Sequence, residues 1–220
     1  MRNRLVKWTI ACMVIASAAG WASGGAVAAE EEQVHGHRVC ITPAMLKLHG
    51  DMRKLLTDHA IWTRNYIVSA IAGLEDQKPV LARLLKNQQD IGNAIKPYYG
   101  EAAGNKLAEL LKEQIVIAGK IVEAAKSGKQ AEIEKLNKDW HRNADDISLF
   151  LSSANPNWKY QEMKDLWYAH LQILTEDVTA RLKKDWEGDI AAFDKGLDHL
   201  LHFSDILTAG IIKQFPKAFQ

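Results

Sequence analysis

Apolar residues recur every three or four positions along almost the whole chain after Thr42, and this spacing restricts the fold more than any other feature. Side chains three and four positions apart lie on one face of an α-helix. No stretch alternates apolar and polar residues for long enough to indicate a strand. The sequence therefore predicts an all-α protein.

Glycine, proline and short polar stretches divide this region into about six helices. Thr42-Pro43 is a typical N-cap and first-turn pair. Short connections between long helices are typical of an antiparallel up-and-down bundle. The expected helices run from Thr42 to about Ala72, from Val80 to Ile95, from Leu107 to Ala125, from Ile133 to Leu151, from about Tyr160, and from Gly188.

The six predicted helices resemble three helices used twice. A shift of about 81 to 85 positions aligns Leu55–His59 with Leu136–Trp140, and Leu84–Gln88 with Leu166–His170. We therefore expect one helical domain over residues 42–220, built from two three-helix repeats at about 42–128 and 129–215.

The first 29 residues have the pattern of a secretory signal peptide. Arg2, Arg4 and Lys7 precede an apolar run, and either Ala26-Val27-Ala28 or the overlapping Val27-Ala28-Ala29 is a small-residue cleavage site before Glu30. The sequence before Cys12 lacks a lipoprotein box. We expect a flexible segment at 30–41 and a protein that is secreted or kept at the cell envelope, and not integral to the membrane once the signal is cleaved. An uncleaved anchor is the alternative.

Charge and cysteine content exclude two classes of protein. The 28 Lys and Arg nearly balance the 27 Asp and Glu, so no strong positive field would attract nucleic acid. Cleavage of the signal would leave Cys40 as the one cysteine, so no internal disulfide is expected. His35, His37 and Cys40 are a secondary candidate for a metal site in the N-terminal segment.

Three polar residues fall within the apolar faces of the first repeat, and each has a counterpart in the second. Polar groups taken out of water need partners, so we expect a buried polar layer, clearest in the first repeat. Such a layer either fixes the register of the helices or lines a small-ligand site. The candidate residues are His59, Gln88 and Gln114, with Trp140, His170 and His199 at the matching positions.

A metal-binding bundle of the hemerythrin or ferritin type is an alternative interpretation of the same residues. His59, His170, Asp177 and His199 are its candidate ligands, and a transition metal would be the cofactor. Di-iron bundles carry Glu-x-x-His on two helices, and none of the helices expected here contains that motif. Cys-x-x-Cys-His is absent too, so no attached haem is expected.

Enzymatic activity is the second alternative, and the sequence gives it little support. No nucleophile elbow, phosphate-binding loop or dinucleotide-binding glycine motif occurs, so no catalytic residue is assigned. Arg64 either forms an internal salt bridge or holds an anion, and the sequence favours the salt bridge. We expect a binding or interaction protein whose ligand or protein partner is unknown.

Four segments resemble a group of uncharacterised bacterial helical proteins common in firmicutes, over about Leu48 to the C-terminus. Some members of that group are labelled glycosyltransferases. An all-α chain lacks the nucleotide-binding sheet that such enzymes use. The resemblance implies a family and no mechanism. The segments are Asp58–Arg64, Leu84–Gly100, Ser152–Trp158 and Gly210–Pro216.

Overall fold

The computed structural model describes residues 41–220, and this part of the chain is helical, as expected. The predicted signal peptide, most of the 30–41 segment and Cys40 lie outside the described residues. The helices are α1 (Pro43–Ala72), α2 (Gln77–Lys126), α3 (Gln130–Ala154), α4 (Tyr160–Leu182) and α5 (Trp186–Gln214), followed by the short 3₁₀-helix η1 (Pro216–Phe219).

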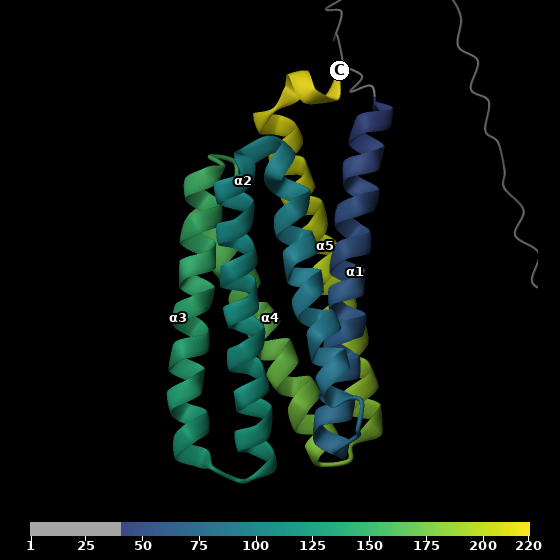
Figure 1. Ribbon diagram of the computed structural model, residues 1–220, viewed down its shortest axis with the longest axis vertical. Helices are drawn as coiled ribbons and strands as arrows, with labels where there is room; N and C mark the ends of the chain where they lie inside the picture. Colours follow the sequence, from purple (N-terminus) through teal and green to yellow (C-terminus); the bar gives the residue numbers. More distant parts are fainter. Residues whose placement is uncertain (1–40) are drawn as a thin grey trace, which may run out of the picture. The chain divides into compact units, whose positions relative to one another are not determined.

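The described chain has five α-helices rather than six, because α2 covers both the second and the third predicted segments. Its backbone leaves the helical region at Gly100, where φ is 83° and ψ is 170°. Figure 1 shows the two arms of α2 side by side after the reversal at this point. Lys112 Nζ on the second arm donates to Gln89 Oε1 on the first at 2.6 Å. The predicted break is therefore present, but the helix continues through Pro97 up to it.

The helix starts follow from their capping residues. Thr42 caps α1, and its hydroxyl accepts from the Met45 backbone N–H at 3.3 Å, as predicted. We expected the second helix only after Pro79, but it begins at Gln77. Proline fits in a first turn, where a backbone N–H has no partner within the helix. The last helix begins at Trp186, before Gly188, because the Asp185 side chain accepts from the Gly188 N–H at 3.0 Å.

Neighbouring helices in the sequence pack side by side, and α5 returns to lie against α1 (Figure 1). The apolar faces meet in one large core and in a smaller cluster near the end of α1. This smaller cluster contains Tyr66, Ala70, Leu84, Ile115 and Val122.

Aromatic rings close the end of the bundle where the chain terminates. Tyr98 beside the α2 break stacks on Phe219, with ring centroids 5.6 Å apart. Tyr99 meets Phe215 edge to face at 5.3 Å. The Thr42 hydroxyl donates to the Phe219 carbonyl at 2.8 Å. Helix α1, the α2 break and the C-terminus are therefore joined at one end.

No helix within residues 41–220 combines the length and the apolar character needed to cross a membrane.

Candidate ligand-binding cavity

A cavity of about 260 Å³ lies among α1, α2, α3 and α4. Most of its wall is aliphatic or aromatic, with contributions from Leu111, Ile115, Leu174 and Val178. Five of the six residues predicted to form a polar layer line it: His59, Gln88, Gln114, Trp140 and His170. The sixth, His199, lies behind His170, and the two imidazole rings stack with centroids 6.0 Å apart.

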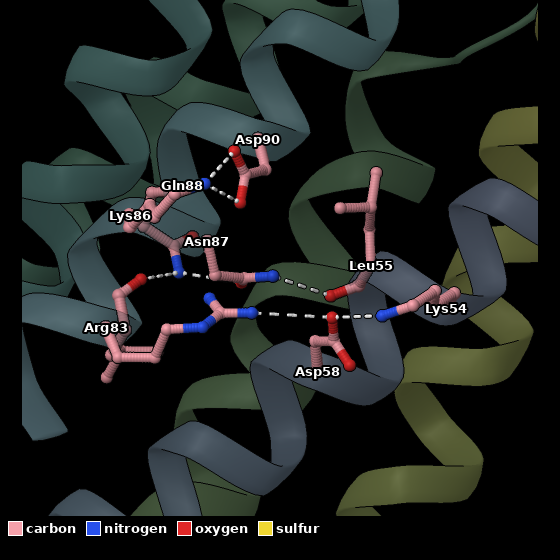
Figure 2. Close-up of polar contacts among 9 residues, drawn as sticks. Lys54, Leu55, Asp58, Arg83, Lys86, Asn87, Gln88 and Asp90 are labelled. Carbon is pink, nitrogen blue, oxygen red and sulfur yellow. Dashed lines mark hydrogen bonds and ion pairs between the residues drawn. The ribbon is translucent and has the colours of Figure 1, made fainter.

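The wall between α1 and α2 is held by hydrogen bonds of buried amides. The two protons of Gln88 Nε2 are shared among three acceptors, His59 Nδ1 at 3.1 Å, the Leu84 carbonyl at 3.0 Å and Asn87 Oδ1 at 3.1 Å. With Nδ1 accepting, neutral His59 carries its proton on Nε2. Asn87 Nδ2 in turn donates to the Leu55 carbonyl at 3.0 Å (Figure 2). The predicted association of His59 with Gln88 is present.

Salt bridges between α1 and α2 lie on the outer side of this wall. Asp58 on α1 contacts Lys54 at 2.6 Å and Arg83 on α2 at 3.6 Å (Figure 2). The guanidinium of Arg83 also lies 5.1 Å from the ring centre of Trp62. The register of α1 on α2 is thus fixed by contacts outside the cavity as well as inside it.

Several buried polar atoms in the wall have no hydrogen-bond partner. They are Gln114 Nε2, Gln114 Oε1, Trp167 Nε1, His170 Nδ1 and Thr63 Oγ1. Buried polar groups are nearly always paired, and each unpaired group costs about 1–3 kcal/mol. Four of the residues with such unpaired atoms line this one cavity.

The cavity is electrically neutral. No Asp, Glu, Lys or Arg side chain lines it. Burial lowers the pKa of His59 from 6.5 to about 4, so its imidazole is neutral at pH 7. Burial, with the neighbouring His59 and His199, also lowers the pKa of His170 well below its usual value.

The mouth of the cavity lies between the N-terminal half of α3 and the C-terminal half of α4. His59, Gln114 and Trp140 are buried, whereas Gln130 and Thr179 are exposed and Asn137 is half-buried. The wall thus runs from a closed, aromatic and amide-rich end to an opening lined by small polar side chains and Ile133 and Leu182.

An ionic cluster lies beside the cavity, between α1, α4 and α5. Arg64 Nη1 lies 2.7 Å from Asp177 Oδ1, and Arg64 also pairs with Asp189. Arg181 Nη1 approaches Asp189 Oδ2 at 2.8 Å. Burial is the largest cause that raises the pKa of Asp177, to about 7. The internal salt bridge favoured for Arg64 is confirmed.

The four candidate metal ligands lie near one another but do not form a set of metal ligands. Asp177 pairs with Arg64, and His199 Nε2 lies 3.0 Å from the Leu166 carbonyl. Between residues 41 and 220, no group of three or more His, Cys, Asp or Glu side chains is arranged to hold a metal ion. His59 and His170 lie close, with ring centroids 5.7 Å apart, but no carboxylate joins them. Residues spaced along one flank of α4 reach different neighbours, and the spacing could not reveal this.

Sequence reasoning missed Trp167 and Thr63 as polar contributors, since both belong to apolar helix faces. The residue type of Trp167 could have identified it, because a buried indole N–H needs an acceptor and no neighbouring residue in the sequence supplies an obvious one. Trp140, by contrast, donates its Nε1 proton to the Gln114 carbonyl at 3.2 Å.

Comparisons with protein-family models, with curated proteins and with solved structures found no match to this chain.

Proposed function

We propose that this protein is an extracytoplasmic binding protein that holds a small, uncharged and largely apolar molecule in the cavity among α1 to α4. The observation that carries the proposal is the unpaired polar atoms of Gln114, Trp167 and His170 in an otherwise apolar wall. Apolar cavities with a few polar groups are the usual form of small-molecule sites.

The electrostatics of the wall support an uncharged ligand. A charged group buried without a counter-ion loses its hydration, at a cost of several kcal/mol. Arg64, beside the cavity, already pairs with Asp177 and Asp189. An anion in the cavity would therefore find no free cationic side chain, and an ammonium group no carboxylate.

The volume of the cavity limits the size of the ligand. An apolar cavity of about 150 Å³ is enough to hold benzene. At about 260 Å³, this cavity has room for roughly two rings, and its open mouth leaves space for a third. Trp140, Trp167 and Tyr66 in the wall provide aromatic surfaces against which such rings would pack.

The proposal also includes export of the protein from the cytoplasm. The signal-peptide pattern at 1–29 would deliver the chain outside the cytoplasm, where it would collect its ligand.

We also propose that the domain arose from two three-helix repeats, 42–128 and 129–215. The cavity would then have formed between them, with His59, Gln88 and Gln114 from the first and Trp140 and His170 from the second. A metal has no place in the proposal, because Asp177 and His199 have other partners.

Two matched fluorescent probes test the proposal. N-phenyl-1-naphthylamine is neutral, and 8-anilinonaphthalene-1-sulfonate adds a sulfonate to nearly the same framework. We expect the protein recovered after export of the full-length chain to bind the neutral probe at one site, at least tenfold more tightly than the anionic one.

Filling the cavity gives the matched variant. Ala118→Phe would place a ring in the cavity and abolish binding of the neutral probe. Val116→Phe, on the exposed side of the same helix, would leave binding unchanged. Equal binding of both probes, or binding unaffected by Ala118→Phe, would contradict the proposal.

A further inference from the structure

We infer that the ligand carries an uncharged group that both donates and accepts hydrogen bonds, a hydroxyl or a carboxamide, and that Gln114 recognises it. This inference rests on the proposed function and adds the chemical class of the ligand. It follows from which polar atoms of the wall are already paired and which are not.

The two glutamines of the wall differ in this respect. The amide nitrogen of Gln88 is fully engaged with His59, Leu84 and Asn87. Both side-chain polar atoms of Gln114 are unpaired, although the residue is only 4% exposed. Gln88 therefore holds the helices together, whereas Gln114 has a donor and an acceptor left for another molecule.

The backbone of Gln114 is held by a hydrogen bond, while its side-chain amide has none. Its carbonyl accepts the indole proton of Trp140, which ties this turn of α2 to α3. Three rotatable side-chain bonds then let the amide turn toward a molecule in the cavity without movement of the helix. A fixed backbone with a free amide suits recognition of a group placed within the cavity.

The other unpaired atoms define which ligand groups are complementary. Trp167 Nε1 only donates, so it calls for an acceptor on the ligand. The amide oxygen of Gln114 only accepts, so it calls for a donor. A hydroxyl or a carboxamide offers both, whereas an ether or ketone offers an acceptor alone and a hydrocarbon neither.

A carboxylate is a poor alternative in this site. It has acceptors only and would leave the oxygen of Gln114 unpaired. It would also carry its charge into a wall where the His59 pKa is lowered to about 4, so the imidazole is not cationic at pH 7. The same wall that favours apolar molecules therefore selects among their polar groups.

The experiment compares 1-naphthol with 1-methylnaphthalene, which have nearly the same shape, by displacement of N-phenyl-1-naphthylamine. Water solvates the hydroxyl better than the methyl group, so burial alone would favour 1-methylnaphthalene. We expect 1-naphthol to bind about threefold to tenfold more tightly, the range set by one net hydrogen bond between uncharged groups.

Substitutions then assign the preference to Gln114. Gln114→Leu keeps the size of the side chain and removes both polar atoms, so 1-methylnaphthalene should still bind while the preference for 1-naphthol is lost. Gln89→Leu is the matched control: it removes an amide from the face of α2 outside the cavity, together with the contact to Lys112, and should keep the preference. Circular dichroism would establish that both variants fold.

Each outcome has one meaning. Equal binding of the two compounds to the unsubstituted protein overturns the inference and leaves the proposed function standing. A preference that survives Gln114→Leu also overturns it. Failure of all the neutral compounds to bind overturns the proposed function, and the inference with it.

Discussion

At the scale of single residues, the buried imidazoles couple folding to pH. Burial lowers the pKa of His59 from 6.5 to about 4, and the pKa of His170 is lowered as well. Below pH 6.5 the unfolded chain binds protons that the folded chain excludes. These histidines therefore leave stability intact above that pH and reduce it as the pH falls from 6.5 to 4.

We predict that His59→Gln weakens this loss of stability in acid. Glutamine offers an acceptor for Gln88 but does not titrate, so up to about 1.4 kcal/mol per pH unit of the loss should disappear. Urea unfolding at pH 4.5 and 7 measures the difference. His202→Gln, at an exposed position, is the control and should not reproduce the smaller loss of stability in acid expected for His59→Gln. An acid response identical in the His59 variant and the unsubstituted protein would refute this account.

The titration of Asp177 changes the stability of the fold with pH in the opposite direction. Burial first, and then a hydrogen bond with Asp189, raises its pKa from 3.8 to about 7. The folded chain therefore retains a proton that the unfolded chain loses, and the contribution of Asp177 to stability declines as the pH rises from about 4 to 7.

Asp177→Asn should remove this decline. The stability of the variant relative to the unsubstituted protein should rise between pH 4 and 7 and level off above that range. Thermal unfolding across this range provides the measurement. A difference that stays constant with pH would show that the carboxyl group does not titrate in this way.

At the scale of elements, the reversal of α2 depends on one backbone conformation. Gly100, with φ of 83° and ψ of 170°, lies in a region that side chains rarely permit. We predict that Gly100→Ala destabilises the protein by about 1–3 kcal/mol. Gly50→Ala is the matched control, because a methyl group there meets nothing within 4 Å inside α1. This control should be neutral or stabilising in chemical denaturation, since alanine favours the helix.

Much of this architecture was predictable because helix periodicity and capping are local. The start of α1 at Thr42-Pro43 and the end of α3 before Pro156 follow from neighbouring residues alone. Five helices stand where six were expected, because Gly100 reverses α2 without a separate loop between its two arms. The duplication of the three-helix unit stays a prediction.

The site was predictable only in part. An interrupted apolar face identifies His59, Gln88 and Gln114 as buried, which they are. Whether a buried amide is paired depends on the neighbouring helix, and no spacing within one helix reveals that Gln88 is satisfied and Gln114 is not. The partner of Asp177 is likewise 113 positions away in the sequence, at Arg64.

At the scale of the whole molecule, the two ends of the bundle differ. The C-terminal end is joined by Phe219, which is buried, and by the ring contacts of Tyr98 and Tyr99. The opposite end carries the mouth of the cavity, where Gln130 and Thr179 are exposed.

Hydrogen exchange should reveal this difference. We predict faster amide exchange in residues 130–137 and 175–182 than around Leu151 and Met163, and a slowing of exchange at the mouth when N-phenyl-1-naphthylamine is bound. The Ala118→Phe variant should show no slowing with the probe. Uniform exchange along α3 and α4 would contradict a mouth at this end.

The contacts at the closed end also separate the rate of ligand exchange from the rate of unfolding. With the proposed function, a molecule would enter or leave where α3 and α4 part at the mouth, while the Thr42–Phe219 contact keeps α1 and the C-terminus joined at the far end. Ligand exchange would then cross a much lower barrier than unfolding. A population of such proteins would turn over its cargo many times within the lifetime of a single folded chain.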